Sequence, residues 1–207
     1  MSAMQLGFAD PVAGAQAVFR ATLAALSRPG TIQALPAELT PPEPLTPELA
    51  ALALALADPD APIWLGPILA GAPDVVDYLR FQTGASIVSR PETAALALVR
   101  RPEDLPPLDA FALGSQDYPD RSTTIVLAVD ELSAGGPRAQ TFQVTGPGVK
   151  GSASFAASSL PSDFAERALA NHALFPRGVD WLLVGSGGVL GLPRSARLSR
   201  HHLEEAA

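Results

Sequence analysis

The sequence contains no cysteine among its 207 residues. This absence excludes disulfide bonds, thiolate zinc sites, cysteine nucleophiles and iron–sulfur ligation in this chain. Lysine is almost absent too, because Lys150 is the only one, so any Schiff-base chemistry would depend on that residue. His172 is the only histidine outside the last seven residues. A lone histidine does not build a metal site, so we expect neither a metal nor another cofactor.

Charge is also scarce, at 17% of the residues, and the net charge is −7. A nucleic-acid-binding protein would show a basic stripe, so we expect no nucleic-acid partner. No apolar run reaches about 18 residues, the length that crosses a bilayer, and the first residues lack the pattern of a secretory signal. We therefore expect a cytoplasmic protein without membrane association. Arginine supplies 13 of the 14 cations, and because it binds phosphate and carboxylate groups well, a local anion site stays open.

The hydrophobic fraction of 47% predicts a sizeable core, within one domain over residues 1–200 followed by a tail over 201–207. Helical spacing and capping residues predict helices near 11–27, 47–56, 73–81 and 163–174. Short apolar runs predict strands near 31–35, 63–65, 85–88, 95–99, 123–129, 140–145, 179–184, 189–192 and 196–199. This mixed order indicates an α/β fold, a three-layer sandwich with a central mixed sheet and helices on both faces.

The same patterns predict two further features, one side of the first helix and one strand pairing. In the first helix Val12, Gln16, Phe19, Leu23 and Leu26 lie on one side at helical spacing. The runs 123–129 and 140–145 are separated by turn-forming residues, which predicts that they pair as a hairpin.

The densest polar cluster is Asp117-Tyr118-Pro119-Asp120-Arg121, directly before the strand-like run 123–129. Loops at the ends of buried strands are common ligand sites, so one interpretation is that Tyr118, Asp120 and Arg121 form the edge of a pocket or a partner contact. The other interpretation is an Asx-type turn with a local ion pair. The sequence leaves both open.

Four arginines lie at element boundaries beside proline, glycine or an aromatic residue: Arg28, Arg80, Arg177 and Arg194. They would form an anion site if the fold brought them together. Alternatively, each neutralises the carbonyl groups at a nearby helix end. His172, near the end of a predicted helix, is expected to play that second role.

The segment Gly146-Pro147-Gly148-Val149-Lys150-Gly151 fits the G-x-G-x-x-G pattern of dinucleotide-binding loops. Such a loop must open a helix, and residues 152–159 are poor helix formers. Pro147 also removes one backbone donor. A turn that connects two strands is therefore the favoured interpretation.

Several segments, in their order along the chain, resemble the phosphonate-metabolism family PhnH, the H subunit of the bacterial carbon–phosphorus lyase system. The matching segments are Gly7-Phe8-Ala9-Asp10-Pro11, Phe19-Arg20, Ser27-Arg28-Pro29-Gly30, Ala57-Asp58, Ala61-Pro62-Ile63-Trp64-Leu65, Leu79-Arg80-Phe81, Gly114-Ser115, Tyr118-Pro119-Asp120-Arg121-Ser122, Thr145-Gly146-Pro147-Gly148, Phe175-Pro176-Arg177-Gly178-Val179-Asp180 and Leu192-Pro193-Arg194. The resemblance runs from about Gly7 to Ser199. One departure is Gln82, where the family pattern has histidine; an amide still donates and accepts hydrogen bonds.

The resemblance implies a fold similar to the large domain of pyridoxal-phosphate (PLP) transferases without their cofactor. It also implies an accessory subunit that works with the G, I and J subunits. Their assembly forms α-D-ribose 1-methylphosphonate 5-triphosphate from ATP and methylphosphonate, and a separate radical subunit later cleaves the carbon–phosphorus bond. Without cysteine, this chain cannot hold the iron–sulfur cluster of that radical step.

Three hypotheses remain open at this point. The chain is an assembly subunit, a homodimer when its partners are absent. Alternatively, it binds or transforms a phosphonate or nucleotide in an arginine-lined pocket. A third hypothesis is a cryptic PLP enzyme that uses Lys150.

Overall fold

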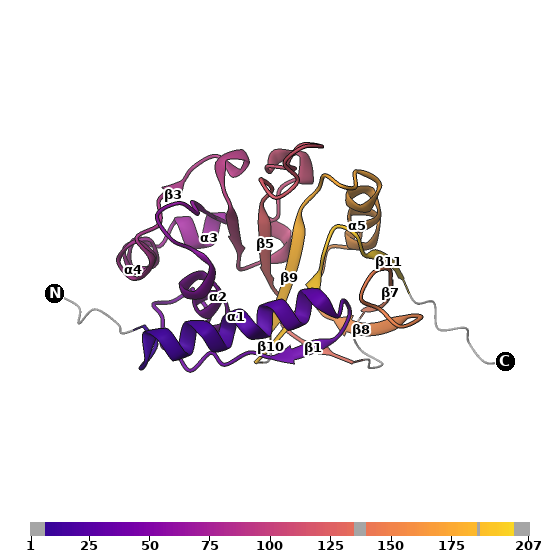
Figure 1. Ribbon diagram of the computed structural model, residues 1–207. Helices are drawn as coiled ribbons and strands as arrows, with labels where there is room; N and C mark the ends of the chain where they lie inside the picture. The colour runs from indigo at the N-terminus through magenta and orange to yellow at the C-terminus, as the bar shows by residue number, and fades with distance from the viewer. Residues whose placement is uncertain (1–6, 135–139, 186, 201–207) are drawn as a thin grey trace.

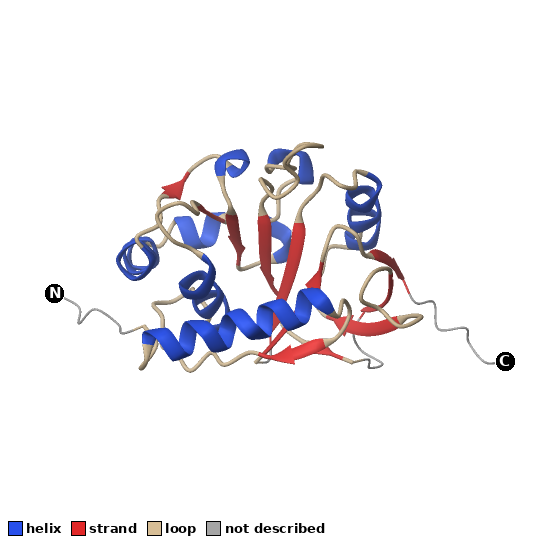
Figure 2. Cartoon of the chain, viewed as in Figure 1, coloured by secondary structure: helices blue, strands red, loops and turns tan. Residues whose placement is uncertain are grey.

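The computed structural model describes residues 7–134, 140–185 and 187–200. Its helices are α1 (Pro11–Ser27), α2 (Pro47–Leu56), α3 (Pro67–Ala70), α4 (Pro73–Thr83) and α5 (Phe164–Ala173), with short 3₁₀ turns at Pro91–Thr93, Pro102–Asp104 and Leu108–Ala110. Its strands are β1 (Ile32–Ala34), β2 (Ile63–Leu65), β3 (Ile87–Val88), β4 (Leu96–Val99), β5 (Thr124–Ala128), β6 (Leu132–Ser133), β7 (Gln140–Thr145), β8 (Ala153–Ala157), β9 (Asp180–Gly185), β10 (Gly188–Leu192) and β11 (Arg197–Arg200). The predicted α/β class, with a mixed central sheet and helices, is confirmed (Figures 1 and 2).

The central sheet has seven strands in the order β1-β10-β9-β5-β4-β2-β3. β9, β5, β4, β2 and β3 are parallel to one another, whereas β10 runs antiparallel to both of its neighbours. Four residues of β5 and all of β4 are buried, as expected for parallel strands covered on both faces. The sheet is therefore mixed because of β10, which lies between β1 and β9.

A second, antiparallel sheet has the order β11-β7-β8-β6. The predicted hairpin between 123–129 and 140–145 is wrong, because β5 pairs with β4 and β9, whereas β7 pairs with β8 and β11. The true partner of β7 is Ala153–Ala157. This segment is rich in alanine and serine, which have little strand propensity, so the sequence pattern does not show it as a strand.

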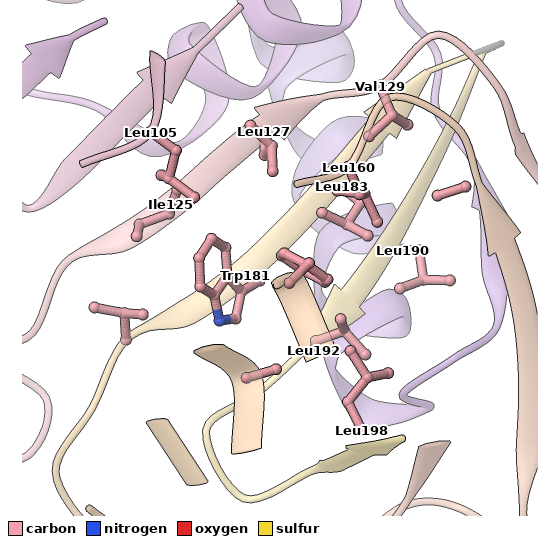
Figure 3. Packing of buried hydrophobic residues seen from close by; sticks show 14 of the residues in the cluster. Leu105, Ile125, Leu127, Val129, Leu160, Trp181, Leu183, Leu190, Leu192 and Leu198 are labelled. Carbon is pink, nitrogen blue, oxygen red and sulfur yellow. The ribbon is translucent and has the colours of Figure 1, made fainter. Parts of the chain in front are cut away.

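Each face of the central sheet has its own core. On one face, buried residues of α1, α2 and α4 pack on the alternate side chains of the strands. The other face, expected to carry helices alone, is covered by the second sheet together with α5. Trp181 is 1% exposed in this second core, where Figure 3 shows it among leucine side chains. The Phe164 ring meets it edge-on at a centroid distance of 5.2 Å.

The predicted bounds of α1 are confirmed, and the structure shows which of its sides is buried. The helix starts at the Asp10 cap, whose Oδ1 accepts from two backbone amides. Its buried residues are Val18, Thr22 and Ala25. Most of the predicted stripe is exposed, namely Val12, Gln16, Phe19 and Leu23, whereas Leu26 is partly buried and packs against the core. The reason is a close approach to β10, where a Cβ on Gly191 would lie 2.7 Å from the backbone of Ala25. Only small side chains fit between elements so close together, so the larger ones remain on the outer side.

Among the described residues, no helix has the length and apolarity needed to cross a membrane. The glycine loop at 146–151 joins β7 to β8, so it opens a strand and not a helix. It therefore lacks the helix that a dinucleotide-binding loop requires. Lys150 lies exposed in this loop.

Candidate functional site

Three loops meet at one edge of the central sheet. The loop over residues 114–122 leads into β5, and the one over 174–179 leads into β9; these two strands lie side by side with Thr124 opposite Asp180. The loop over 193–196 follows β10, whose last residue, Leu192, lies opposite Trp181. This is the amino-terminal edge of the parallel strands, whereas ligands of open α/β sheets usually bind at the carboxyl-terminal edge.

Arg194 joins the three loops through its guanidinium group. Its Nη2 contacts Asp180 Oδ2 at 2.6 Å and donates to Ser122 Oγ at 2.5 Å, and its Nε donates to Asp180 Oδ1 at 3.1 Å. Its Nη1 donates to the carbonyl oxygen of Pro119 at 2.6 Å and weakly to that of Pro176 at 3.5 Å. The side chain is only 12% exposed. Each nitrogen of this guanidinium therefore bonds within the chain, which fixes the loops relative to one another.

The loop before β5 is held by its backbone. Gly114 has φ of +69°, and a Cβ there would lie 2.8 Å from the carbonyl oxygen of Pro119, so only glycine fits. The Ser115 amide donates to the carbonyl of Tyr118 at 3.1 Å, and the Tyr118 amide donates to Ser115 Oγ at 3.0 Å. Thr123 is fully buried and donates to the carbonyl of Ala94 at 2.7 Å, which joins the loop to the neighbouring strand β4.

The loop before β9 is held by Asn171, a residue of α5 that is 2% exposed. Its side-chain amide donates to the carbonyl of Val179, and its Oδ1 accepts from the Val179 amide, both at 2.9 Å. Gly178 has φ of +124°, and a Cβ there would lie 2.7 Å from Asn171 Oδ1. The bend therefore requires glycine beside an asparagine.

His172 lies one residue further along α5 and contacts the third loop. Arg197 Nε donates to His172 Nε2 at 2.9 Å, so Nε2 acts as an acceptor. The proton is then on Nδ1, which donates to the carbonyl of Arg194 at 3.2 Å. His172 lies in the last turn of α5, as predicted, but the carbonyl that it bonds belongs to Arg194 and not to its own helix end.

An open depression of about 320 Å³ lies beside this junction. It is lined by Pro119, Asp120, Phe175, Pro176, Asp180, Pro193, Arg194 and Ser195. Outside it, Tyr118 is 54% exposed and the guanidinium of Arg121 lies 4.4 Å from its ring centroid, a cation–π contact. The local ion pair that the sequence left open does not form: among the described residues, Arg121 makes no ion pair with a neighbouring carboxylate.

The other predicted arginines are distributed over the molecule. Arg177 lies in the loop before β9, and its Nε is buried without a hydrogen-bond partner among the described residues. Arg28 is the exposed C-cap of α1, and Arg80 is exposed in the last turn of α4, next to the β2–β3 end of the sheet. Neither lines the depression. The structure thus groups Tyr118, Asp120, Arg121, Arg177 and Arg194 and leaves Arg28 and Arg80 apart.

Sequence reasoning missed Asp180 and Ser122, which are the partners of Arg194. It also missed Asn171. A signal for two of them exists. Ser122 and Asp180 lie in the segments 118–122 and 175–180, both of which carry the family resemblance. They meet Arg194, which lies in a third such segment, 192–194. Asn171 has no such signal, because asparagine in a helix gives no indication of its tertiary contacts.

The fold and the junction define a class: an α/β protein with a mixed sheet, whose most connected polar residue joins loops at the amino-terminal strand edge. Within that class, the family described as "Bacterial phosphonate metabolism protein (PhnH)" matches residues 6–199, and the chain belongs to this family. A relative from Rhizobium meliloti (strain 1021) is 40% identical over 193 residues, which cover 93% of this chain and 94% of the relative. That relative is the "Alpha-D-ribose 1-methylphosphonate 5-triphosphate synthase subunit PhnH".

Proposed function

We propose that this chain is an accessory subunit of a carbon–phosphorus lyase core complex in organic phosphonate catabolism. It supports formation of α-D-ribose 1-methylphosphonate 5-triphosphate from ATP and methylphosphonate, and other subunits complete the chemistry. Its expected partners are the G, I and J subunits. The observation that carries the proposal is the 40% identity to a synthase subunit along nearly the whole of both chains.

The hydrogen bonds that the polar side chains make within the chain support an accessory role. The most connected arginine, Arg194, is fully used in holding loops, and its partner Asp180 is used with it. His172 bonds Arg194 and Arg197 through its two ring nitrogens, so it is not paired with a hydroxyl nucleophile. Such contacts serve a rigid surface better than proton transfer.

The test is co-expression of this chain with the G, I and J subunits of the same system. We expect the chain to co-purify with them and to raise the rate at which they convert ATP and methylphosphonate. Absence of both effects would remove the proposal. Turnover of either substrate by the purified chain alone would replace the accessory role with a catalytic one.

A second candidate function is supported by the depression beside Arg194. In this proposal it binds a phosphonate or nucleotide, with Tyr118, Asp120, Arg121 and Arg177 around its mouth and Arg28 and Arg80 contributing only through another copy or subunit. A ligand at about 100 times its Kd raises the free energy of unfolding by about 2.7 kcal/mol. ATP and methylphosphonate at millimolar concentration should therefore raise the Tm.

The matched variants are Arg121→Met, beside the depression, and Arg90→Met, an exposed arginine whose one ion pair among the described residues is with Glu92. The first should abolish the ligand-induced rise in Tm and the second should retain it. No rise in Tm for the unmodified chain with either ligand would eliminate the binding function and leave the accessory role untouched.

Further proposals follow from family membership. We propose that residues 1–200 form one domain with a tail at 201–207, that the fold is similar to the large domain of PLP-dependent transferases, and that PLP is not bound. An absorbance band on adding PLP, lost in Lys150→Ala, would contradict the last point.

We also propose a cytoplasmic protein that forms a homodimer without its partners. Sedimentation analysis of the isolated chain tests the homodimer. Gln82→His tests whether the family histidine changes assembly or activity.

A further inference from the structure

The outer side of α1 carries an apolar stripe that its own fold leaves uncovered. We call it the α1 seam and define it as Val12, Gln16, Phe19, Leu23 and Leu26, of which the first four are exposed and Leu26 is partly buried against the core. Val12 is 67% exposed, Phe19 46% and Leu23 50%. Figure 1 shows α1 along the outside of the molecule, with no other element in front of it. These side chains are large apolar groups in contact with water, and contiguous patches of this kind mark interaction sites.

The spacing of the seam is that of a helix-pairing surface. Its residues follow one another at steps of four, three, four and three positions, which is the a/d repeat of a heptad. From Val12 to Leu26 the seam is about 21 Å long, at 1.5 Å per residue. An amphipathic helix of about four turns matches this length and pattern.

The seam leads into a depression at the amino-terminal end of α1. This depression has a volume of about 360 Å³ and is lined by Gly7, Phe8, Ala9, Pro11, Leu54, Phe81 and Gln82. Phe81 is 63% exposed at its edge. A pocket of this kind beside an apolar stripe accepts one large anchor side chain from a docked partner, as at the centres of protein interfaces.

The charge beside the seam indicates the chemistry of the partner. Arg20 is exposed on the seam's outer flank and is the only charged residue within Pro11–Ser27, and Arg28 follows directly. The protein as a whole has a net charge of −7. A partner helix with acidic residues on the matching flank would therefore be attracted to this side of an otherwise acidic protein.

A second copy of the chain is a poor occupant for the seam. In an antiparallel pair of α1 helices the outer flanks face each other, which sets Arg20 opposite its own copy, an unfavourable like-charge contact. In a parallel pair each Arg20 faces the inner flank of the copy, which offers no acidic residue, because Arg20 is the only charged residue within Pro11–Ser27. Copies of this chain would have to pair through another surface.

We propose that the α1 seam docks an amphipathic helix of another subunit of the complex, with acidic residues facing Arg20 and an apolar anchor in the depression beside Phe81. The inference rests on the proposed accessory function and adds the surface and the kind of partner segment. It predicts that the seam is buried only when the other subunits are present.

The absence of cysteine provides a direct test. Gln16→Cys places one thiol on the seam, and Leu169→Cys places one on α5 at a site that is 54% exposed in the free chain. Each protein is co-expressed with the G, I and J subunits, and the rate of maleimide labelling at this thiol is measured in the complex and in the isolated chain. We expect labelling at position 16 to be at least about tenfold slower in the complex, because a docked interface excludes water, and labelling at position 169 to be unchanged.

Substitutions provide the second arm. Phe19→Glu and Leu23→Glu should weaken co-purification by at least about tenfold in apparent Kd, because each removes an apolar contact and places an acid opposite the acidic partner helix. Arg20→Glu should weaken it as well. Leu169→Glu, a matched exposed leucine on α5, should leave it unchanged.

The outcomes separate the inference from the proposed function. If the unmodified chain co-purifies and raises activity while the seam variants do so equally well, the inference is wrong and the accessory function stands. Equal labelling of position 16 in the complex and in the free chain leads to the same conclusion. Protection of position 16 in the isolated chain at rising concentration would show that a second copy occupies the seam, and it would overturn the proposed partner. If the unmodified chain does not assemble, both proposals fall.

Discussion

Removing the guanidinium of Arg194 should destabilise the whole amino-terminal edge of the sheet. Arg194→Ala leaves the Asp180 carboxylate, which is only 24% exposed, without its cation. It also removes donors from Ser122 Oγ and from the Pro119 carbonyl. Breaking a buried ion pair costs about 3–5 kcal/mol. Because this pair is partly exposed, we expect the lower end, about 3 kcal/mol of unfolding free energy.

The assay is urea unfolding together with thermal melting. For a domain of this size 1 kcal/mol corresponds to about 2–4 °C in Tm, so the expected decrease is roughly 6–12 °C. Arg80→Ala is the control, because Arg80 is exposed and no hydrogen bond or ion pair is described for its side chain; its effect should stay within about 0.5 kcal/mol. Arg194→Lys should recover part of the loss, since lysine keeps the charge but cannot reach several acceptors at once.

A double-mutant cycle with Asp180→Asn isolates the pair itself. The two residues are in direct contact at 2.6 Å, so their effects should not add, and we expect a coupling of at least about 1 kcal/mol. A coupling near zero, or an Arg194→Ala variant as stable as the unmodified chain, would refute the structural role assigned to this arginine.

Three further substitutions test buried polar groups. Tyr78→Phe should stabilise the protein by roughly 1 kcal/mol, because the buried hydroxyl has no partner among the described residues. Burial raises the pKa of Tyr78, so the unmodified chain should lose stability as the pH rises above about 10, the usual tyrosine pKa, and the variant should lack this component in urea titrations at pH 8 and 10.5. Asn171→Leu should cost about 2–4 kcal/mol in unfolding free energy, because it leaves both backbone groups of Val179 without their partner. Thr123→Val should cost about 1–2 kcal/mol in the same measurement, since it removes the bond to Ala94. A change of the opposite sign in any of the three would contradict the contact concerned.

The structure narrows the roles that the polar clusters can play. The cluster at Tyr118–Arg121 and the boundary arginines allow both a pocket and a set of local structural contacts from sequence alone. The structure brings part of the cluster to the mouth of a depression and assigns Arg194 to the interior of a loop junction. An arginine whose donors are already used is available to a ligand only if those loops open.

Strand predictions succeed where side chains are large and branched. The runs that form β5 and β9 are recognisable because buried parallel strands are continuously apolar. β8 is not recognisable, since its alanines and serine have no strong strand preference and its position is set by pairing with β7 and β6. The mistaken hairpin between β5 and β7 follows from the absence of β8 from the predicted strands; the two-residue strand β6 is absent from them as well.

The sequence by itself determined the α/β class, the family, the bounds of most elements and the chemistry that the chain cannot perform, because periodicity, capping and the absence of cysteine are local properties. Only the tertiary structure decided which side of α1 is buried, since this depends on how closely Gly191 lets the helix approach the sheet. Likewise, only the fold decided that Ser122, Asp180 and Arg194 meet while Arg28 and Arg80 stay apart. These contacts join residues distant along the chain, and it is the pairing order of the strands that brings them together.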